Sequence, residues 1–177
     1  MTTFLELALK RRSIRKYLDK PVEDEKIQTI LQAALASPSS KHSNPWEFVV
    51  VSDREVLQKM ATCRTYGSSM LQNSPLGIAV CVDPAVTDTW QCDGAIASLN
   101  MLLCAEDIGL GGCWVQVNGR TLSEDETKTA DEYIRELLNI PGNLRVLCVV
   151  SIGYKAEEKK MINTEKLQYE KIHYGQY

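Results

Sequence analysis

Excess positive charge and long apolar runs are both missing from this sequence. Its 177 residues include 20 Lys and Arg against 23 Asp and Glu, a formal net charge of -3. Without surplus cations or a basic stripe interleaved with aromatics, we expect no nucleic-acid partner. No stretch approaches the ~18 consecutive apolar residues of a membrane span. Lys10, Arg11 and Arg12 come before any apolar segment long enough for a signal peptide. We therefore expect no membrane partner and a cytoplasmic location.

Histidine is scarce, and the cysteines lack metal-ligand spacing. The six cysteines form no Cys-x-x-Cys pair and have no histidine at ligand spacing, so we expect reduced, mostly buried thiols and no metal site. The two histidines, His42 and His173, belong to no local Ser or Cys nucleophile pattern, which disfavours a His-based hydrolase.

Phosphate-binding loops and the serine nucleophile elbow are also absent as motifs. The cluster from Gly109 to Gly112 looks superficially like a dinucleotide fingerprint. It follows an expected helix and precedes an expected strand, whereas a dinucleotide site needs the reverse order. We reject that interpretation.

The composition that remains is typical of one globular domain covering residues 1–177. Apolar residues make up 44% and charged residues 24%. A chain of this length buries roughly 70% of its unfolded surface. After Gly153 the sequence becomes charged and aromatic with little periodicity, so residues 155–177 are expected to form an arm that packs on another surface.

Helix signals recur along the chain. Capping boxes at Thr3–Glu6, Ser52–Glu55 and Ser123–Glu126 predict three helix starts. Helical spacing of apolar residues predicts another helix that ends near Ala36, and residues 90–109 read as a nearly enclosed helix ended by glycines.

Four apolar runs predict strands at Trp46–Val51, Leu76–Val82, Cys113–Val117 and Leu144–Ile152. Their alternation with helices favours, by itself, a doubly wound parallel sheet.

The segment Arg11-Arg-Ser-Ile-Arg15 is the strongest candidate for binding chemistry. A phosphate monoester carries close to two negative charges and several acceptor oxygens, so closely spaced guanidinium groups with a hydroxyl are suited to hold it. Alone, the segment is a weak signal and is more typical of a solvated basic run.

Three further segments, in order, resemble the nitroreductase family. They are Pro38-Ser-Ser-Lys-His-Ser-Asn-Pro-Trp46 with the apolar run after it, Asp93 to Trp114, and Ser151-Ile-Gly-Tyr-Lys155. Together with Arg11–Arg15, they spread the resemblance over nearly the whole chain. It implies an α+β, three-layer fold in which helices flank a mixed, largely antiparallel sheet, and we adopt this in place of the parallel sheet. It also implies a homodimer with the C-terminal arm wrapped over the partner.

The resemblance also implies site residues for FMN. Arg11, Arg12, Ser13 and Arg15 match positions that hold the phosphate, the ribityl chain and the pyrimidine edge. The loop of Pro38, Ser39 and Ser40 matches one that reaches the flavin bound mainly by the other subunit. Gln116 and Val117 are candidates for backbone contact near flavin N5, and Gly153 with Lys159 or Lys160 matches the closure of the phosphate site.

Three positions depart from the family pattern. His42 and Asn44 stand in place of Asn and Gln before Pro-Trp, and Lys155 stands where Pro is usual. The changes at His42 and Asn44 affect the hydrogen bonds expected at the edge of the flavin ring, and the change at Lys155 affects a local turn.

The expected activity is transfer of hydride from NADH or NADPH through flavin N5 to a small acceptor such as a nitroaromatic or a quinone, with ping-pong kinetics. Because the flavin carries the chemistry, no dedicated catalytic side chain is expected. Two alternatives stay open: a family specialist that reduces an enone, a halogenated aromatic or flavin, and a flavin-binding or phospholigand-binding module without turnover. The sequence distinguishes neither NADH from NADPH nor one acceptor from another.

Overall fold

The computed structural model describes residues 3–122 and 127–177. Its single sheet contains β1 (Trp46–Val51), β2 (Leu76–Val82), β3 (Gly111–Gln116) and β4 (Arg145–Gly153) in the order β1-β2-β4-β3. All three strand pairs are antiparallel. Sequence alternation alone therefore gave the wrong strand direction, and the largely antiparallel sheet implied by the family resemblance is confirmed. Parallel pairing in the described residues is limited to a bridge between Ser13 and Gly112.

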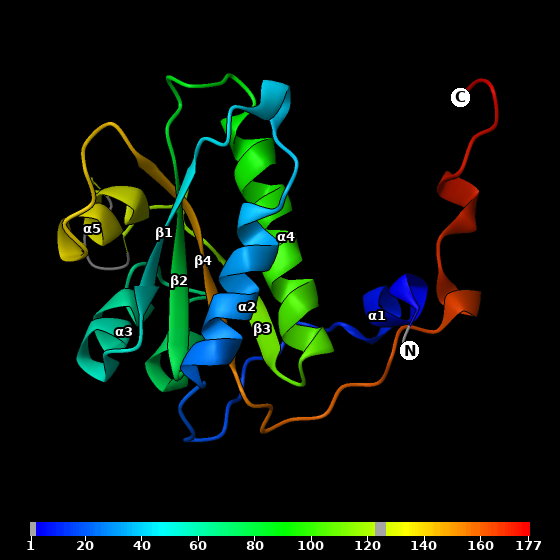
Figure 1. The fold of residues 1–177 in the computed structure, drawn as a ribbon, viewed down its shortest axis with the longest axis horizontal. Coiled ribbons are helices and arrows are strands. Elements are labelled where there is room, and N and C mark those ends of the chain that lie inside the picture. The colour runs from blue at the N-terminus through cyan, green and yellow to red at the C-terminus, as the bar shows by residue number, and fades with distance from the viewer. Residues whose placement is uncertain (1–2, 123–126) are drawn as a thin grey trace.

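Helices cover both faces of this sheet (Figure 1). One layer consists of α2 (Asp24–Leu35) and α4 (Trp90–Asp107), and the opposite layer consists of α3 (Arg54–Ala61) and α5 (Ala130–Leu137). The three-layer α+β architecture is thus confirmed. A first short helix, α1 (Phe4–Lys10), lies outside both layers.

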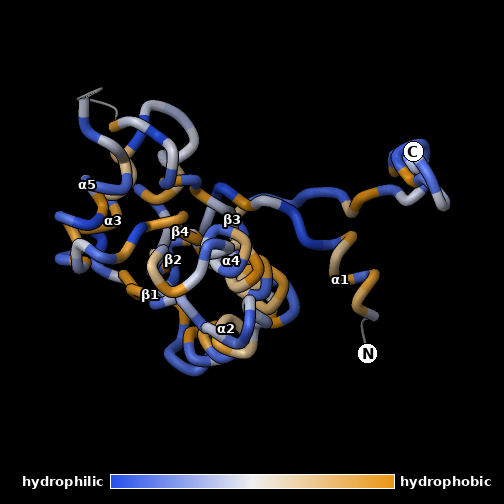
Figure 2. Tube along the Cα trace, turned by 90° about the horizontal axis from the view of Figure 1, so that it is seen from above, coloured by the Kyte–Doolittle hydropathy of each residue, from blue (hydrophilic) through white to orange (hydrophobic). Residues whose placement is uncertain are grey.

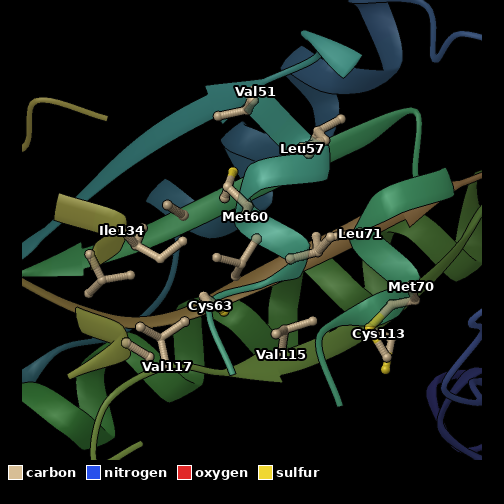
Figure 3. Packing of buried hydrophobic residues seen from close by; sticks show 14 of the residues in the cluster. Val51, Leu57, Met60, Cys63, Met70, Leu71, Cys113, Val115, Val117 and Ile134 are labelled. Carbon is tan, nitrogen blue, oxygen red and sulfur yellow. The ribbon is translucent and has the colours of Figure 1, made fainter. Parts of the chain in front are cut away.

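Each face of the sheet contributes to its own apolar core. On the α3 and α5 side, Leu57, Met60 and Ile134 pack on strand residues such as Val115, as Figure 3 shows. On the other side, α2 and α4 bury a second cluster against the same strands. Every residue of β2 is consequently buried. This explains the misleading sequence pattern, because an uninterrupted apolar strand is the usual signature of a parallel sheet.

Polar side chains cap the helix starts as expected, but some of the capping residues differ from the predicted ones. Thr3 caps α1 in a full capping box with Glu6, as predicted. The third helix is capped by Asp53, whose carboxylate accepts from the Val56 amide, so the box assigned to Ser52 was wrong by one residue. For the fifth helix, the predicted cap at 123–126 lies outside the described residues, and Thr129 forms the capping box with Glu132.

The N-terminal helix and the C-terminal segment project from the same side of the body (Figure 2). None of the residues of α1 is buried, and Phe4 and Leu5 are largely exposed. The segment after Lys160 is exposed almost throughout and contains two short 3-10 turns, Thr164–Lys166 and Tyr169–Lys171. No helix in the described part of the chain has the length and apolar character needed to cross a membrane.

Candidate functional site

The arginine segment is held along the free edge of β3. The Arg11 amide donates to the Leu7 carbonyl at 2.9 Å and ends α1. The chain then runs extended, with Ser13 bridged to Gly112 and the Ile14 amide donating to the Gly112 carbonyl at 3.0 Å. Because Ile14 is buried, it anchors the flanking arginines to the sheet.

A buried tyrosine fixes the end of this segment. The Tyr17 hydroxyl donates to the Ile14 carbonyl at 2.7 Å and lies 2.7 Å from Ser151 Oγ on β4. Burial raises the pKa of the Tyr17 phenol, so the group is neutral and available as a donor.

Residues 154–160 run beside the arginine segment. The Leu18 amide donates to the Tyr154 carbonyl at 2.9 Å, and the Ala156 amide donates to the Lys16 carbonyl at 3.0 Å. Further along, the Lys159 ammonium donates to the Ser13 carbonyl, and the Arg12 guanidinium donates to the Lys160 carbonyl. The structure therefore brings both predicted basic segments together.

The carboxylate of Glu157 also connects residues 154–160 to the arginine segment. Its carboxylate accepts from the Arg15 amide at 2.6 Å and lies 3.4 Å from the Lys159 ammonium. The Arg15 amide and the nearby Lys159 charge lower the pKa of Glu157. The carboxylate thus holds the backbone of Arg15, while the Arg15 side chain stays exposed.

A cavity of about 250 Å³ opens between the two segments. Its charged lining comprises four cations and two carboxylates: Lys10, Arg12, Lys155, Lys159, Glu106 and Glu158. Lys155 and Glu106 form an ion pair at 2.6 Å. Lys159 is also shared with Glu157. Four cations against three carboxylates leave a net positive charge, which suits an anion such as a phosphate monoester.

The three arginines do not converge on this cavity. Arg12 lines it together with Ile14. Arg15 instead lines a second cavity, of about 230 Å³, together with Tyr17. Extended backbone places successive side chains on opposite sides, which accounts for the separation. The predicted cluster is therefore split between two sides of one extended segment.

Gly153 lies where β4 meets the segment of Tyr17. A Cβ atom at this position would approach Pro75 to 2.7 Å and Tyr17 to 2.9 Å. In this structure the glycine allows the close approach of Tyr17, and through Tyr17 it positions the arginine segment.

At the end of β3, the backbone amides of Gln116 and Val117, the two candidates for a contact near flavin N5, point in different directions. The Gln116 carbonyl accepts from Arg64 Nη1 at 3.0 Å, away from β4. In an antiparallel pair, the N–H and C=O of one residue point to the same side, so the Gln116 amide faces the free edge. The Val117 amide instead donates to the Leu147 carbonyl at 3.2 Å. Gln116 is thus the residue of the pair whose amide can meet a ligand.

The loop of Pro38, Ser39 and Ser40 lies at the far end of α4. The Ser40 amide donates to Asp93 Oδ1 at 3.0 Å in the first turn of α4, whereas Glu106 lies in its last turn. At 1.5 Å per residue, these two ends are about 20 Å apart. The described chain does not bring this loop to the cation cavity.

The loop has a constrained backbone. Lys41, His42 and Asn44 all have positive φ, at 52°, 56° and 44°. Ser39 Oγ closes the loop by accepting from the Asn44 amide at 2.9 Å. Two departures from the family pattern, His42 and Asn44, thus lie at strained positions of the kind that cluster at functional sites.

Sequence reasoning missed several residues that complete the site. These residues are Tyr17, Glu157 and Glu106. No sequence motif gave them a role, and each contacts a residue that is far away in the sequence. Lys155 was noted only as a departure, with no signal for its ion pair.

The cysteines are free thiols and mostly buried, as expected from the sequence. All six thiols are free, four are buried, Cys104 is partly exposed and Cys92 is exposed. In the described residues no group of His, Cys, Asp and Glu could hold a metal ion. The two histidines are exposed.

Comparison with known proteins places this arrangement in a family. The nitroreductase family model matches residues 8–72 and 82–154. An FMN-dependent nitroreductase from Clostridium difficile R20291 is 44% identical, with a TM-score of 0.94 over 98% of this chain and 100% of that chain. A protein of Archaeoglobus fulgidus named "Putative NADH dehydrogenase/NAD(P)H nitroreductase" is 42% identical over 90% of this chain and 89% of its own length. An NADH dehydrogenase of Thermus thermophilus is 36% identical over 85% of this chain and 86% of its own length. The chain belongs to the nitroreductase family.

Proposed function

We propose that this protein is an FMN-dependent NAD(P)H oxidoreductase that works as a homodimer. The observation that carries the proposal is the cation-rich cavity between the arginine segment and residues 155–159, beside β3, which offers a phosphate site. The C. difficile relative, with nearly the same fold, is described as FMN-dependent. The residues present fit the phosphate end of that cofactor.

Two groups of residues hold the cofactor in this proposal. Arg12 and Lys159 line the cavity and bind the phosphate, with Lys160 next to Lys159 in the chain. Arg11 and Ser13 lie on the Arg15 side of the extended segment and hold the ribityl chain. Arg15 faces the pyrimidine edge from the other side of the extended segment. The Gln116 amide at the sheet edge is the donor near N5, and Val117 holds the neighbouring backbone against β4. Gly153 positions the arginine segment through Tyr17.

The protein contributes placement and electrostatics. When bound, FMN supplies the hydride chemistry between a reduced nicotinamide and an acceptor. Cationic side chains near the pyrimidine edge favour negative charge there, and a fixed amide orients the reacting atom. No side chain of the described residues is assigned proton abstraction or nucleophilic attack.

Nicotinamide and acceptor use the same open face in turn, which gives ping-pong kinetics. The acceptor is a small aromatic or quinone-like molecule, because an open face selects flat acceptors that stack on the ring. In steady-state assays, parallel lines in double-reciprocal plots are expected. Intersecting lines would exclude this order.

The second part of the site comes from the partner subunit. In one chain, Pro38, Ser39 and Ser40 lie about 20 Å from the cation cavity along α4. Apolar side chains on α1 and on the C-terminal arm are exposed in the single chain, among them Phe4, Tyr169 and Ile172. A dimer that buries them places the loop of one chain at the flavin of the other.

An anaerobic titration tests the activity. The purified protein is expected to be yellow, and NADH or NADPH should bleach its visible absorbance. Addition of a nitroaromatic or a quinone should then restore it. A colourless protein that does not take up FMN would refute the proposal, and a yellow protein that neither nicotinamide bleaches would be a flavin-binding module without turnover.

Hybrid dimers test the shared site. Arg12→Met impairs the cation cavity, and Ser39→Ala with Ser40→Pro impairs the loop, so each homodimer should bind FMN weakly. A mixed dimer made by co-expression with two affinity tags contains one site with both native parts. It should bind one FMN per dimer with native affinity. Two equally impaired sites in the mixed dimer would show that loop and cavity serve the same chain.

A further inference from the structure

A fourth cation, Lys155, lines the cavity that contains Arg12 and Lys159. We propose that Lys155 is a direct ligand of the phosphate and that buried Glu106 weakens this contact by competing for the same ammonium group. This inference rests on the proposed function. It assigns a role to a residue at which this chain departs from the family pattern.

The backbone around Lys155 is fixed on both sides. The carbonyl of Tyr154 accepts from the Leu18 amide, and the amide of Ala156 donates to the Lys16 carbonyl. These two bonds tie the neighbours of Lys155 to the end of the arginine segment. The Lys155 side chain therefore starts from a defined position beside Arg12 and Lys159.

A glycine opens the route of the lysine side chain. A Cβ atom at Gly111 would come within 2.9 Å of Lys155 Cγ. The absence of a side chain at Gly111 lets the lysine stem cross the start of β3 to reach the last turn of α4. There its ammonium group meets Glu106.

Burial of the two partners is unequal. The Glu106 side chain is 2% exposed and the Lys155 side chain is 28% exposed. Both carboxylate oxygens accept from Lys155 Nζ, at 2.6 and 2.7 Å. An ammonium group has three N–H donors, so at least one remains for a ligand in the cavity. The lysine is thus the exposed partner, and the carboxylate behind it is enclosed.

Glu106 opposes the anion that Lys155 attracts. Both residues line the cavity, so a phosphate there approaches a buried carboxylate as well as the ammonium group. Like charges repel most strongly where water is excluded. Removal of Lys155 should therefore weaken phosphate binding, and neutralisation of Glu106 should strengthen it. A purely structural ion pair predicts the same direction for both changes, because breaking either partner loosens the turn.

The test compares FMN with riboflavin, which has the same ring and ribityl chain but no phosphate. Dissociation constants for both are measured by fluorescence titration of the full-length protein after the flavin is removed. The ratio of the two constants isolates the phosphate contribution. Lys155→Met should lower the preference for FMN about tenfold, as expected for loss of one charged hydrogen bond. Glu106→Gln should raise it about threefold, and Lys155→Arg should retain most of it.

A matched control removes the same charge elsewhere. Lys59 is exposed on α3, on the opposite layer, so Lys59→Met should leave the preference unchanged. Thermal melts without ligand report the structural cost of each substitution separately from binding.

The outcomes separate this inference from the proposed function. If Lys155→Met and Glu106→Gln weaken FMN and riboflavin equally, the pair is a structural clamp and the inference is overturned. An unchanged preference in Lys155→Met overturns it as well. Should Glu106→Gln fail to fold, salt dependence decides: loss of a direct ion contact makes the FMN preference of Lys155→Met less sensitive to salt, and unchanged sensitivity refutes the contact. Failure of the unsubstituted protein to bind FMN would instead refute the proposed function.

Discussion

Replacement of Tyr17 by Phe removes one oxygen from the junction between the arginine segment and the sheet. The phenol has one proton, which goes to the Ile14 carbonyl at 2.7 Å, so Ser151 Oγ at 2.7 Å is the donor to the phenolic oxygen. The ring itself is buried and remains in Tyr17→Phe. The substitution therefore tests the hydrogen bonds with little change in packing.

The expected cost follows from what remains unsatisfied. Ser151 Oγ retains an acceptor, the Cys113 carbonyl at 3.3 Å, but the buried side of the Ile14 carbonyl loses its phenolic donor. A buried polar group left without its partner costs about 1–3 kcal/mol. We expect Tyr17→Phe to lower the free energy of unfolding by about 2 kcal/mol. It should also weaken FMN binding several-fold, because Ile14 sits between Arg12 and Arg15.

Urea unfolding followed by circular dichroism measures the first effect, and flavin titration measures the second. Tyr133→Phe is a matched control, since its hydroxyl donates to the Lys59 carbonyl at 3.1 Å in an exposed position. Its cost should be about 0.5 kcal/mol or less, because water replaces an exposed partner. Equal costs for the two substitutions would show that the Tyr17 contacts do not anchor the segment.

Further substitutions and a chemical probe test other parts of the structure. Gly111→Ala should destabilise the protein by about 1–3 kcal/mol in urea unfolding, since the new Cβ would lie 2.6 Å from Ile14 Cγ1. Gly142→Ala, with no atom within 4 Å of its Cβ, should be near neutral, and equal effects would contradict the assigned clash. Because the folded pKa of Glu157 is lowered, its contribution to stability is complete above its ordinary pKa near 4.3 and is lost as pH falls through the lower folded value. Melting temperatures of the native protein and Glu157→Gln should therefore converge as pH falls through the lowered folded pKa of Glu157, and a difference that stays constant until acid unfolding would exclude this charge effect. A thiol reagent at pH 8 should modify Cys92 quickly and the four buried cysteines only after unfolding, and rapid native modification of all six would contradict their burial.

Strand positions were predictable from the sequence, but strand direction was not. The apolar runs at Trp46–Val51 and Leu76–Val82 became β1 and β2 with the same bounds. Helices on both faces bury β2 completely, which removes the alternation that would mark an antiparallel strand with one solvated face. Periodicity reports burial, and burial here is the same for either direction. The resemblance to a known family supplied the direction.

Helix caps show how far local chemistry extends. Thr3 and Glu6 form the predicted box because nothing competes for these exposed groups. Near Asp53 two adjacent residues can cap a helix, and Asp53, the residue directly before Arg54, does so. The local motif thus located the start of α3 to within one residue, whereas α5 begins after Thr129, six residues beyond the predicted cap at Ser123.

The candidate site, like the fold, could be predicted from the sequence only in part. The sequence places arginines and a serine close together, which makes Arg11–Arg15 a candidate phosphate site, but only the family resemblance favours that site over a solvated basic run. Ion pairs such as Lys155 with Glu106 join residues far apart in sequence, and no local pattern encodes them. The split of Arg12 and Arg15 between two cavities follows from the extended backbone after α1, which the capping signal does not specify.

The arrangement of basic groups links cofactor binding to assembly in the proposed dimer. The cations come from the end of α1 and from the start of the C-terminal segment, and both continue into parts of the chain with few buried residues. Such segments are ordered by whatever they pack against. A partner that buries Phe4 and the arm also fixes Arg12 and Lys159, so part of the entropy cost of ordering the phosphate site is met by dimer formation. By linkage, FMN must then stabilise the dimer by the same free energy by which the dimer tightens FMN binding. In the proposed dimer, cofactor affinity is thus a property of two chains, and the residues of one chain form only part of the proposed site.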